Sequence, residues 1–182
     1  MKLALLVALL ALPAAAKERE GVVAPPTIEV AGKPLRLMGM GLRKKFIFKV
    51  YLASLYVQNP IQDAQQLINS DQIKRVQMHM LRDLDSGKII EAVQEGFERN
   101  AAPEMPRLQA RLDRFLKSIP DLKAGQTIVI TYFPSRGTVI KAGTGQELTL
   151  EGKDFADALF SVWLGNHPVD DDLKGEMMSN NQ

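Results

Sequence analysis

The stretch Gly39-Met-Gly-Leu-Arg-Lys-Lys-Phe-Ile-Phe-Lys-Val-Tyr-Leu-Ala-Ser-Leu-Tyr-Val57 joins two glycines, three successive cations and a long aromatic and β-branched segment. The composition of residues 46–57 predicts one long β-strand. We interpret the glycine pair as a flexible lead into Arg43. The strand therefore carries or adjoins a permanent cation and two phenols, Tyr51 and Tyr56. This combination suits a pocket for an apolar molecule that bears an acid or carbonyl group.

The rest of the chain divides into alternating strand and helix patterns. Strands are predicted at 27–30, 35–40, 46–57, 74–81, 127–133, 138–141 and 147–150, and helices at 61–68, 85–100, 103–119, 154–164 and from Asp170 onward. Hairpin connections outnumber strand–helix–strand units in this order. We therefore expect an α+β fold, in which helices pack on one face of a mainly antiparallel sheet.

The N-terminal residues have the pattern of a secretory signal. Residues 1–16 contain a lysine, an apolar run over residues 3–12 and a small-residue cleavage site that ends at Ala16. The alternative is a retained anchor helix, although the run is only about half of the ~20 residues that span a bilayer. We expect a periplasmic protein with no stable membrane insertion after cleavage. A flexible arm at 17–26 would precede a single domain at 27–182.

Composition argues against several classes of function. The chain has no cysteine and only two histidines, so a structural zinc site is not expected. The formal net charge of +2 falls to +1 without Lys2, which gives no nucleic-acid footprint. No dinucleotide or hydrolase motif is present. The acidic run at 170–172 is typical of a helix start, with a loose calcium site as the alternative. We expect no cofactor and no metal.

Arg43 is the strongest single candidate for a binding residue, because a guanidinium stays charged when it is buried and matches a carboxylate with a planar fork. Eight residues of straight strand would place Tyr51 about 26 Å away. The two share a site only if the chain bends at Lys44 or Lys45, or at a bulge. Otherwise Arg43 is an exposed hairpin residue and Tyr51 a core aromatic. Arg82 is expected either in a surface ion pair with Asp83 or Asp85 or, as the alternative, near the mouth of the cleft.

Two segments resemble the chalcone isomerase-like proteins. The quoted stretch resembles their opening strand pair. The segment Phe155-Ala-Asp-Ala-Leu-Phe-Ser-Val-Trp-Leu-Gly-Asn-His-Pro-Val-Asp170 resembles their closing helix and exit turn. This resemblance implies an open-faced β-sandwich with a ligand cleft between the sheet and a layer of helices. It also places the arginine of the family's Gly-x-Arg motif at Arg43.

The other catalytic positions of plant chalcone isomerases do not carry over. By the same resemblance, the strand threonine falls on Tyr51, the tyrosine before the next helix on Asp85, and the asparagine within that helix on Ala92. The late threonine has no match near Asp170. Loss of one such hydrogen-bond donor typically costs ~10²–10³ in rate. The resemblance therefore favours a member that is not a chalcone isomerase.

Three functions remain open at this point. The first is a non-catalytic binding protein for a fatty acid or similar amphipathic acid, in which Arg43 pairs with the carboxylate. Tyr51, or in its place Tyr56, would donate a second hydrogen bond. The second is an isomerase or lyase that acts on a conjugated carbonyl compound. The third is an envelope interaction module with no small ligand, whose interior would hold no cavity of ~300 Å³ or more. The sequence does not identify a protein partner.

Overall fold

The computed structural model of the chain describes residues 16–179. Its main body is a seven-stranded sheet with the order β3-β4-β5-β6-β7-β8-β9, in which every neighbouring pair is antiparallel. The strands are β3 (Thr27–Val30), β4 (Lys33–Lys45), β5 (Phe48–Val57), β6 (Lys74–Met80), β7 (Thr127–Phe133), β8 (Gly137–Ala142) and β9 (Leu148–Leu150). The expected antiparallel sheet is confirmed. Two expectations reach outside this range: only Ala16 of the predicted signal peptide is described, and the last three residues of the expected domain at 27–182 are not.

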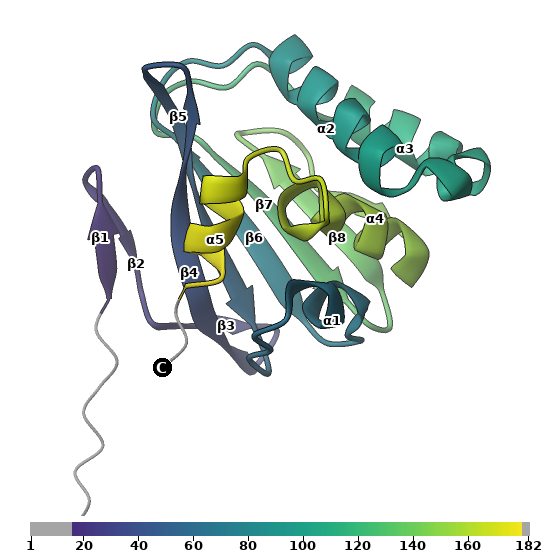
Figure 1. Cartoon of the computed structure of the whole chain (residues 1–182), viewed down its shortest axis with the longest axis horizontal. Coiled ribbons are helices and arrows are strands. Elements are labelled where there is room, and N and C mark those ends of the chain that lie inside the picture. The colour runs from purple at the N-terminus through teal and green to yellow at the C-terminus, as the bar shows by residue number, and fades with distance from the viewer. Residues whose placement is uncertain (1–15, 180–182) are drawn as a thin grey trace, which may run out of the picture.

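Helices cover one face of this sheet (Figure 1). They are α1 (Ala64–Asn69), α2 (Ser86–Asn100), a 3₁₀ turn (Ala102–Glu104), α3 (Met105–Lys117), α4 (Lys153–Leu164) and α5 (Asp171–Met177). Asp85 caps α2 by accepting the Gly87 N–H at 2.8 Å. Asp170 caps α5 by accepting the Leu173 N–H at 2.9 Å. The expected α+β class, with a layer of helices on an open-faced β-sandwich, is confirmed.

The β4–β5 hairpin differs from the predicted long strand. Phe46 and Ile47 form a two-residue turn, and Lys45 pairs with Phe48 across it. Arg43 consequently lies directly opposite Tyr51, with a register shift between Arg43 and Lys44. The required bend between these two residues is thus a hairpin turn, together with the irregularity beside Lys44.

The glycine pair serves close packing and not flexibility. A Cβ atom on Gly39 would lie 2.3 Å from the Glu176 carbonyl oxygen, and one on Gly41 would lie 2.7 Å from the Leu173 carbonyl oxygen. Neither glycine has a positive φ angle. Helix α5 can therefore lie directly on β4 only because both positions lack a side chain.

The predicted flexible arm at 17–26 is a hairpin over most of its length. Strands β1 (Lys17–Arg19) and β2 (Val22–Ala24) pair antiparallel beside the main sheet, beyond β4 in Figure 1. Arg19 contacts Glu176 of α5 at 2.7 Å, and Lys49 of β5 contacts Glu20 in the hairpin turn at 2.7 Å. These contacts tie the segment to the body of the molecule.

Hydrophobic side chains form two clusters, one on each face of β5. Ala53, Leu55 and Val57 pack beneath the helices, whereas Leu52 and Tyr56 pack on the other face. The prediction that β5 is covered on both sides is therefore confirmed. The helix-covered cluster is the larger, and it surrounds the pocket described next.

Candidate functional site

An apolar pocket of about 470 Å³ opens between the sheet and α2, close to the β4–β5 turn. Its interior is lined by aliphatic and thioether side chains, namely Met78, Met80, Ile89, Val93, Ile128 and Val162. Charged side chains stand around it at Arg43, Lys45, Arg82, Asp83, Asp85 and Lys88. The volume lies within the ~300–1,000 Å³ typical of small-molecule sites. An apolar interior with a charged surround suits a molecule that has one polar end.

A second hollow of about 540 Å³ lies between α1, α4 and the end of α2. Its lining is mostly polar or charged and includes Asn69, Arg99, Asn100, Arg107, Lys153, Asp154 and His167. This composition does not suit an apolar ligand. The pocket beside the β4–β5 turn is therefore the candidate site.

Arg43 lies at the wall of this pocket and already has a partner. Its Nη1 atom donates to Oδ2 of Asp170 at 2.7 Å and to the Lys44 carbonyl at 2.6 Å. Both side chains of the Arg43–Asp170 pair are largely buried, with exposed fractions of 20% and 16%. Both hydrogen bonds that Arg43 donates within residues 16–179 leave from Nη1. The Nε and Nη2 groups remain as donors for a carboxylate.

Tyr51 lies opposite Arg43 and presents a hydrogen-bond donor to the same space. Its hydroxyl accepts a hydrogen bond from Nε1 of Trp163 at 3.1 Å. Because the indole can only donate, the phenolic proton of Tyr51 is left to point elsewhere. Burial raises the pKa of Tyr51 to about 12, against smaller lowering effects of Trp163 and Arg43. The phenol is therefore neutral at physiological pH, and can donate.

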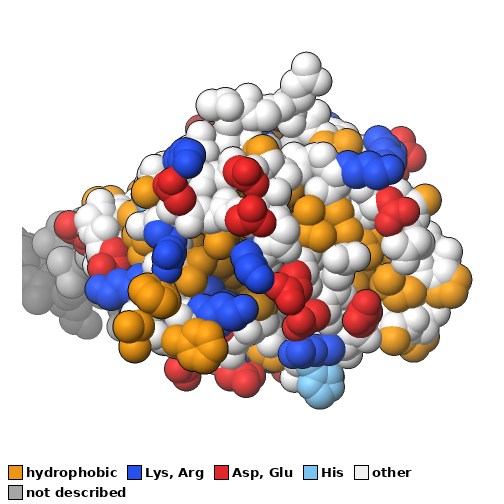
Figure 2. Space-filling view, turned by 90° about the horizontal axis from the view of Figure 1, so that it is seen from above, with side chains coloured by type: hydrophobic (Ala, Val, Ile, Leu, Met, Phe, Trp, Pro, Cys, Tyr) orange, Lys and Arg blue, Asp and Glu red, His pale blue; other side chains and the backbone are white. Residues whose placement is uncertain are grey.

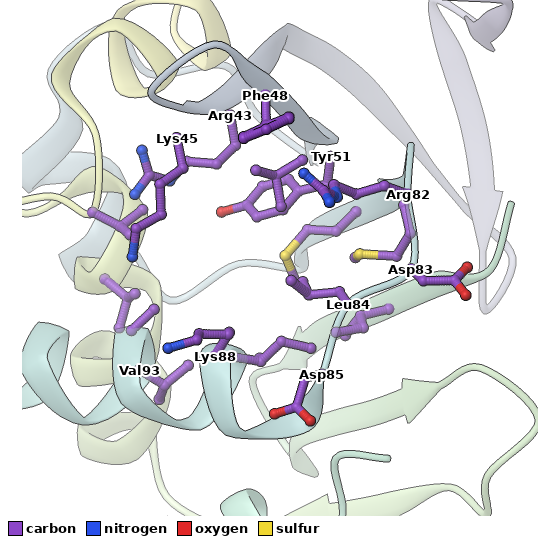
Figure 3. A pocket seen from close by; sticks show the side chains of 18 of the residues that line it. Arg43, Lys45, Phe48, Tyr51, Arg82, Asp83, Leu84, Asp85, Lys88 and Val93 are labelled. Carbon is purple, nitrogen blue, oxygen red and sulfur yellow. The ribbon is translucent and has the colours of Figure 1, made fainter. Parts of the chain in front are cut away.

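Figure 3 shows how these groups are placed. Arg43, Lys45 and Tyr51 lie on the wall that the hairpin provides, and Lys88 and Val93 lie on the facing helix α2. A cation and a neutral hydroxyl thus flank an apolar space. Together they supply the two kinds of hydrogen-bond donor that a carboxylate at the pocket wall would accept.

Arg82 lines the pocket, as one of the two sequence interpretations expected. Its guanidinium lies 4.7 Å from the centre of the Phe48 ring, so it stacks on an aromatic side chain. The expected ion pair with Asp83 or Asp85 is wrong within the described residues. Asp83 instead pairs with Lys123 at 2.8 Å, and Asp85 is used as the cap of α2.

Tyr56, the third predicted binding residue, lies elsewhere. It is five residues from Tyr51 on the same strand, so its side chain points to the opposite face of the sheet. There it is buried in the second cluster, and it does not line the pocket. The structure therefore brings Arg43 and Tyr51 together and leaves Tyr56 outside their site.

All three positions that the resemblance aligned with isomerase donors, namely Tyr51, Asp85 and Ala92, line the pocket. Asp85 is the N-cap of α2, and Ala92 lies near the middle of that helix. The Asp85 carboxylate accepts the Gly87 N–H, and alanine has no polar atom in its side chain. Neither residue offers a neutral donor in place of tyrosine or asparagine.

Sequence reasoning missed the partners that hold the two site residues. Asp170 fixes Arg43 from 127 positions away, and Trp163 orients Tyr51 from 112 positions away. Asp170 was assigned only to a helix start, which is confirmed. No local pattern connects either pair, because both contacts arise when α4 and α5 pack on the sheet.

A second buried cation, Lys74, lies at the far end of β5 and β6 from the hairpin turn. Its Nζ atom donates to the carbonyls of Leu67, Ile68 and Ser70 at the end of α1. Its side chain is fully buried and lies 3.7 Å from Oδ1 of Asp157. Burial lowers the pKa of Lys74 to about 8, and the nearby Asp157 opposes that shift.

Residues 16–179 contain neither a metal-binding cluster nor a membrane-spanning helix. No cluster of three or more histidine, aspartate or glutamate side chains in this part of the chain is placed to hold a metal ion. In the same residues, no helix has both the length and the apolarity needed to cross a bilayer.

An antiparallel sheet with helices on one face and an apolar pocket between them defines an α+β class of protein, and comparison with known proteins identifies the family. The family model for "chalcone isomerase-like" proteins matches residues 16–179. The chain belongs to the chalcone isomerase-like family, and the predicted resemblance is confirmed. A comparison with curated protein sequences gave no significant match.

Similar solved structures include a fatty-acid binding protein of Arabidopsis thaliana. The two chains share 16% sequence identity and superpose with a TM-score of 0.68, over 91% of this chain and 97% of the plant protein. At this identity the likeness establishes the fold. The assignment of the site residues rests on the geometry described above.

Proposed function

We propose that this protein is a non-catalytic carrier that binds a fatty acid or similar amphipathic acid in the pocket beside Arg43. One observation carries the proposal: a 470 Å³ apolar pocket has a guanidinium and a neutral phenol at its wall. The carboxylate would accept from the unused nitrogens of Arg43 and from the hydroxyl of Tyr51. The hydrocarbon chain would lie among the methionine and branched side chains. The similarity to a plant fatty-acid binding protein supports this assignment.

The proposal also includes a location. The signal-like pattern at residues 1–16 supports export to the periplasm, where the carrier would act. Cell fractionation of the full chain, and of a chain that begins at Lys17, tests this part. We expect the full chain in the periplasmic fraction and the shortened chain in the cytoplasm. Equal distribution of the two chains would contradict the location without affecting the pocket.

Titration of the delipidated protein with palmitate tests the binding role. Arg43→Ala should weaken palmitate binding about 10–100-fold, because hydrogen bonds to charged groups contribute about 1.5–3 kcal/mol. The methyl ester of palmitate provides the matched ligand, since it keeps the chain and removes the charge. It should bind wild type and variant alike.

The matched protein control is Arg36→Ala, which removes an exposed arginine from the same strand and outside the pocket. This variant should bind palmitate as the wild type does. If palmitate binds Arg43→Ala as tightly as the wild type, the role of Arg43 is wrong. If neither palmitate nor its ester binds the wild type, the carrier function is wrong.

A further inference from the structure

The turn between β4 and β5 exposes an unusual cluster of large apolar side chains. Phe46 is 89% exposed, Ile47 is 87% exposed and Phe48 is 52% exposed. We call these three residues the hairpin tip. The only other large hydrophobic residue with such exposure in residues 16–179 is Val23. Figure 2 looks onto this end of the molecule and shows apolar side chains gathered beside lysine and arginine. Contiguous exposure of this kind marks a contact surface.

The backbone of the hairpin tip indicates that the aromatic residue is not there for the turn. Phe46 has a φ angle of 55° and takes the first position of a two-residue hairpin turn. Glycine is favoured at such a position, because a side chain raises the energy of the left-handed conformation. A phenylalanine that is almost wholly exposed gains little packing to offset this cost. Local strain at a turn with an exposed ring therefore points to a role outside the fold.

Cations surround the hairpin tip. Lys44, Lys45, Lys49, Arg82 and Lys88 all lie on the hairpin or at the adjacent pocket. Lys49 and Lys88 have acidic partners, in Glu20 at 2.7 Å and Glu91 at 3.5 Å. Within residues 16–179, neither Lys44 nor Lys45 has an acidic oxygen within 4 Å. Acidic side chains also lie on this side, at Asp83 and Asp85 beside the pocket, at Glu91 and Glu95 on α2, and at Asp171, Asp172 and Glu176 beside Lys44.

We infer that the hairpin tip is a docking surface for an anionic phospholipid bilayer. Aromatic and aliphatic side chains enter the headgroup boundary of a bilayer, and adjacent lysines are attracted to anionic headgroups. The same cations would repel a second copy of the tip, so charge favours the bilayer over self-association. Such docking is peripheral and reversible.

The position of the pocket suggests a function for this docking. Phe46 and Phe48 belong to the hairpin tip and also line the pocket. The pocket therefore opens at the surface that would face the bilayer. An amphipathic acid could then exchange between bilayer and pocket without crossing open water. This last step rests on the proposed function, whereas docking itself does not.

Vesicle co-sedimentation of the chain from Lys17 onward tests the inference. The protein should bind vesicles of phosphatidylcholine mixed with phosphatidylglycerol, bind vesicles of phosphatidylcholine alone more weakly, and release as salt is raised. Ile47→Ser should lower the partition coefficient about tenfold, as expected for loss of a large buried aliphatic group. Val23→Ser is the matched control, with an exposed aliphatic residue elsewhere, and should not change binding. Absence of binding to mixed vesicles, or equal effects of both variants, overturns the inference.

A second variant separates docking from folding. Phe46→Gly relieves the left-handed strain, so its Tm should rise while its vesicle binding falls. A lower Tm would mean that Phe46 supports the fold, and would overturn the argument from strain. Light scattering without vesicles must show a monomer, because a dimer that Ile47→Ser dissolves would assign the tip to self-association instead.

Palmitate binding in the absence of vesicles keeps the two proposals distinguishable. Ile47 does not line the pocket, so Ile47→Ser should bind palmitate with wild-type affinity. Loss of both palmitate and vesicle binding in this variant would show that Ile47 supports the pocket or the fold, and would overturn docking. Vesicle binding by a wild type that takes up no palmitate would support docking and refute the carrier function.

Discussion

Two cations on the helix-covered face of the sheet occupy opposite ends of the molecule and have different surroundings. Arg43 lies beside an open pocket, uses one nitrogen for its partners and retains others. Lys74 is fully buried, and its ammonium donates to three carbonyls. An ammonium has three protons, so that group is saturated. Burial alone therefore does not mark a binding residue, whereas unused donors beside open space do.

The same comparison separates structure from function on a single sheet. The Lys74 end closes the last turn of α1, and the rings of Tyr132 and Phe160 lie 5.3 and 5.4 Å from its charge. The Arg43 end leaves space among methionines and valines. We therefore expect substitutions at Lys74 to change stability and substitutions near Arg43 to change ligand binding.

Paired methionine substitutions should give the largest contrast. Lys74→Met leaves the buried Ile68 carbonyl and the partly buried Ser70 carbonyl without the donor they have here, at about 1–3 kcal/mol for each buried group. We expect the free energy of unfolding to fall by about 2–4 kcal/mol in urea titrations. Arg43→Met should lower it by less, by about 1–2 kcal/mol, because the Asp170 carboxylate that loses this partner still accepts the Leu173 N–H. Equal losses in the free energy of unfolding of the two variants would contradict the distinction between a structural Lys74 and a ligand-binding Arg43.

A smaller effect is expected from alkaline pH, which should change the free energy of unfolding through Lys74. Burial lowers the pKa of Lys74 from 10.5 to about 8, so the unfolded chain binds more protons than the folded chain between these values. The free energy of unfolding should therefore rise with pH in this window, by up to about 1.4 kcal/mol per pH unit. Burial raises the pKa of Tyr51, Tyr56 and Tyr132, and these groups oppose the rise near pH 10, where the unfolded chain loses their protons first.

Urea titrations of wild type and Lys74→Met between pH 8 and pH 10 isolate the lysine, since both proteins keep the tyrosines. The stability of the wild type should rise relative to that of the variant. Parallel pH profiles would show that Lys74 keeps its ordinary pKa in the folded chain.

Loss of the Tyr51 hydroxyl should reduce ligand binding about tenfold. Tyr51→Phe removes the neutral donor and keeps the ring, and hydrogen bonds to a charged group contribute about 1.5–3 kcal/mol. Calorimetric titration with palmitate measures the effect. Tyr56→Phe is the matched control, because its hydroxyl belongs to the opposite face of the sheet. A larger loss at Tyr56 than at Tyr51 would reverse the placement of the site.

The smallest expected effect is a gain in palmitate affinity. Asp170→Asn keeps a side chain that caps α5 about as well as aspartate, and removes the carboxylate that competes for Arg43. Palmitate affinity should rise about threefold, a change of roughly 0.7 kcal/mol. Calorimetry at low ionic strength is the appropriate measurement. Weaker binding would indicate that Asp170 orients Arg43 toward the ligand instead of competing with it.

Most of the fold could be predicted from local pattern. The apolar stripes of α2 and α3 and the proline and glycine breaks placed those helices within a few residues of their observed bounds. The β4–β5 turn could not be placed, because Phe46 and Ile47 are strand-forming residues and no glycine or asparagine marks the turn. The strain at Phe46 is the reason that the pattern failed there.

The sequence predicts two residues of the site, Arg43 and Tyr51, but it does not predict how they are arranged. Arg43 was identified by its charge and its motif. Its contact with Tyr51 depended on a turn with no sequence signal, and its pair with Asp170 on packing between distant elements. Tyr56 is a predicted binding residue because it carries a phenol on the same strand as Tyr51. The sequence does not show which face of that strand the pocket occupies. Alternation along β5 separates the two tyrosines only once that face is known.

The contact between α5 and β4 has a consequence for how the chain avoids aggregation. Strand β3 pairs with β4 only as far as Arg36, and no other strand in residues 16–179 pairs with the later part of β4 on that side. Glu176 accepts the Leu42 N–H at 2.7 Å, and the glycines let the helix lie close. A chain cut before α5 would expose this edge as a template for another strand. The last helix thus keeps the sheet from growing from one molecule to the next.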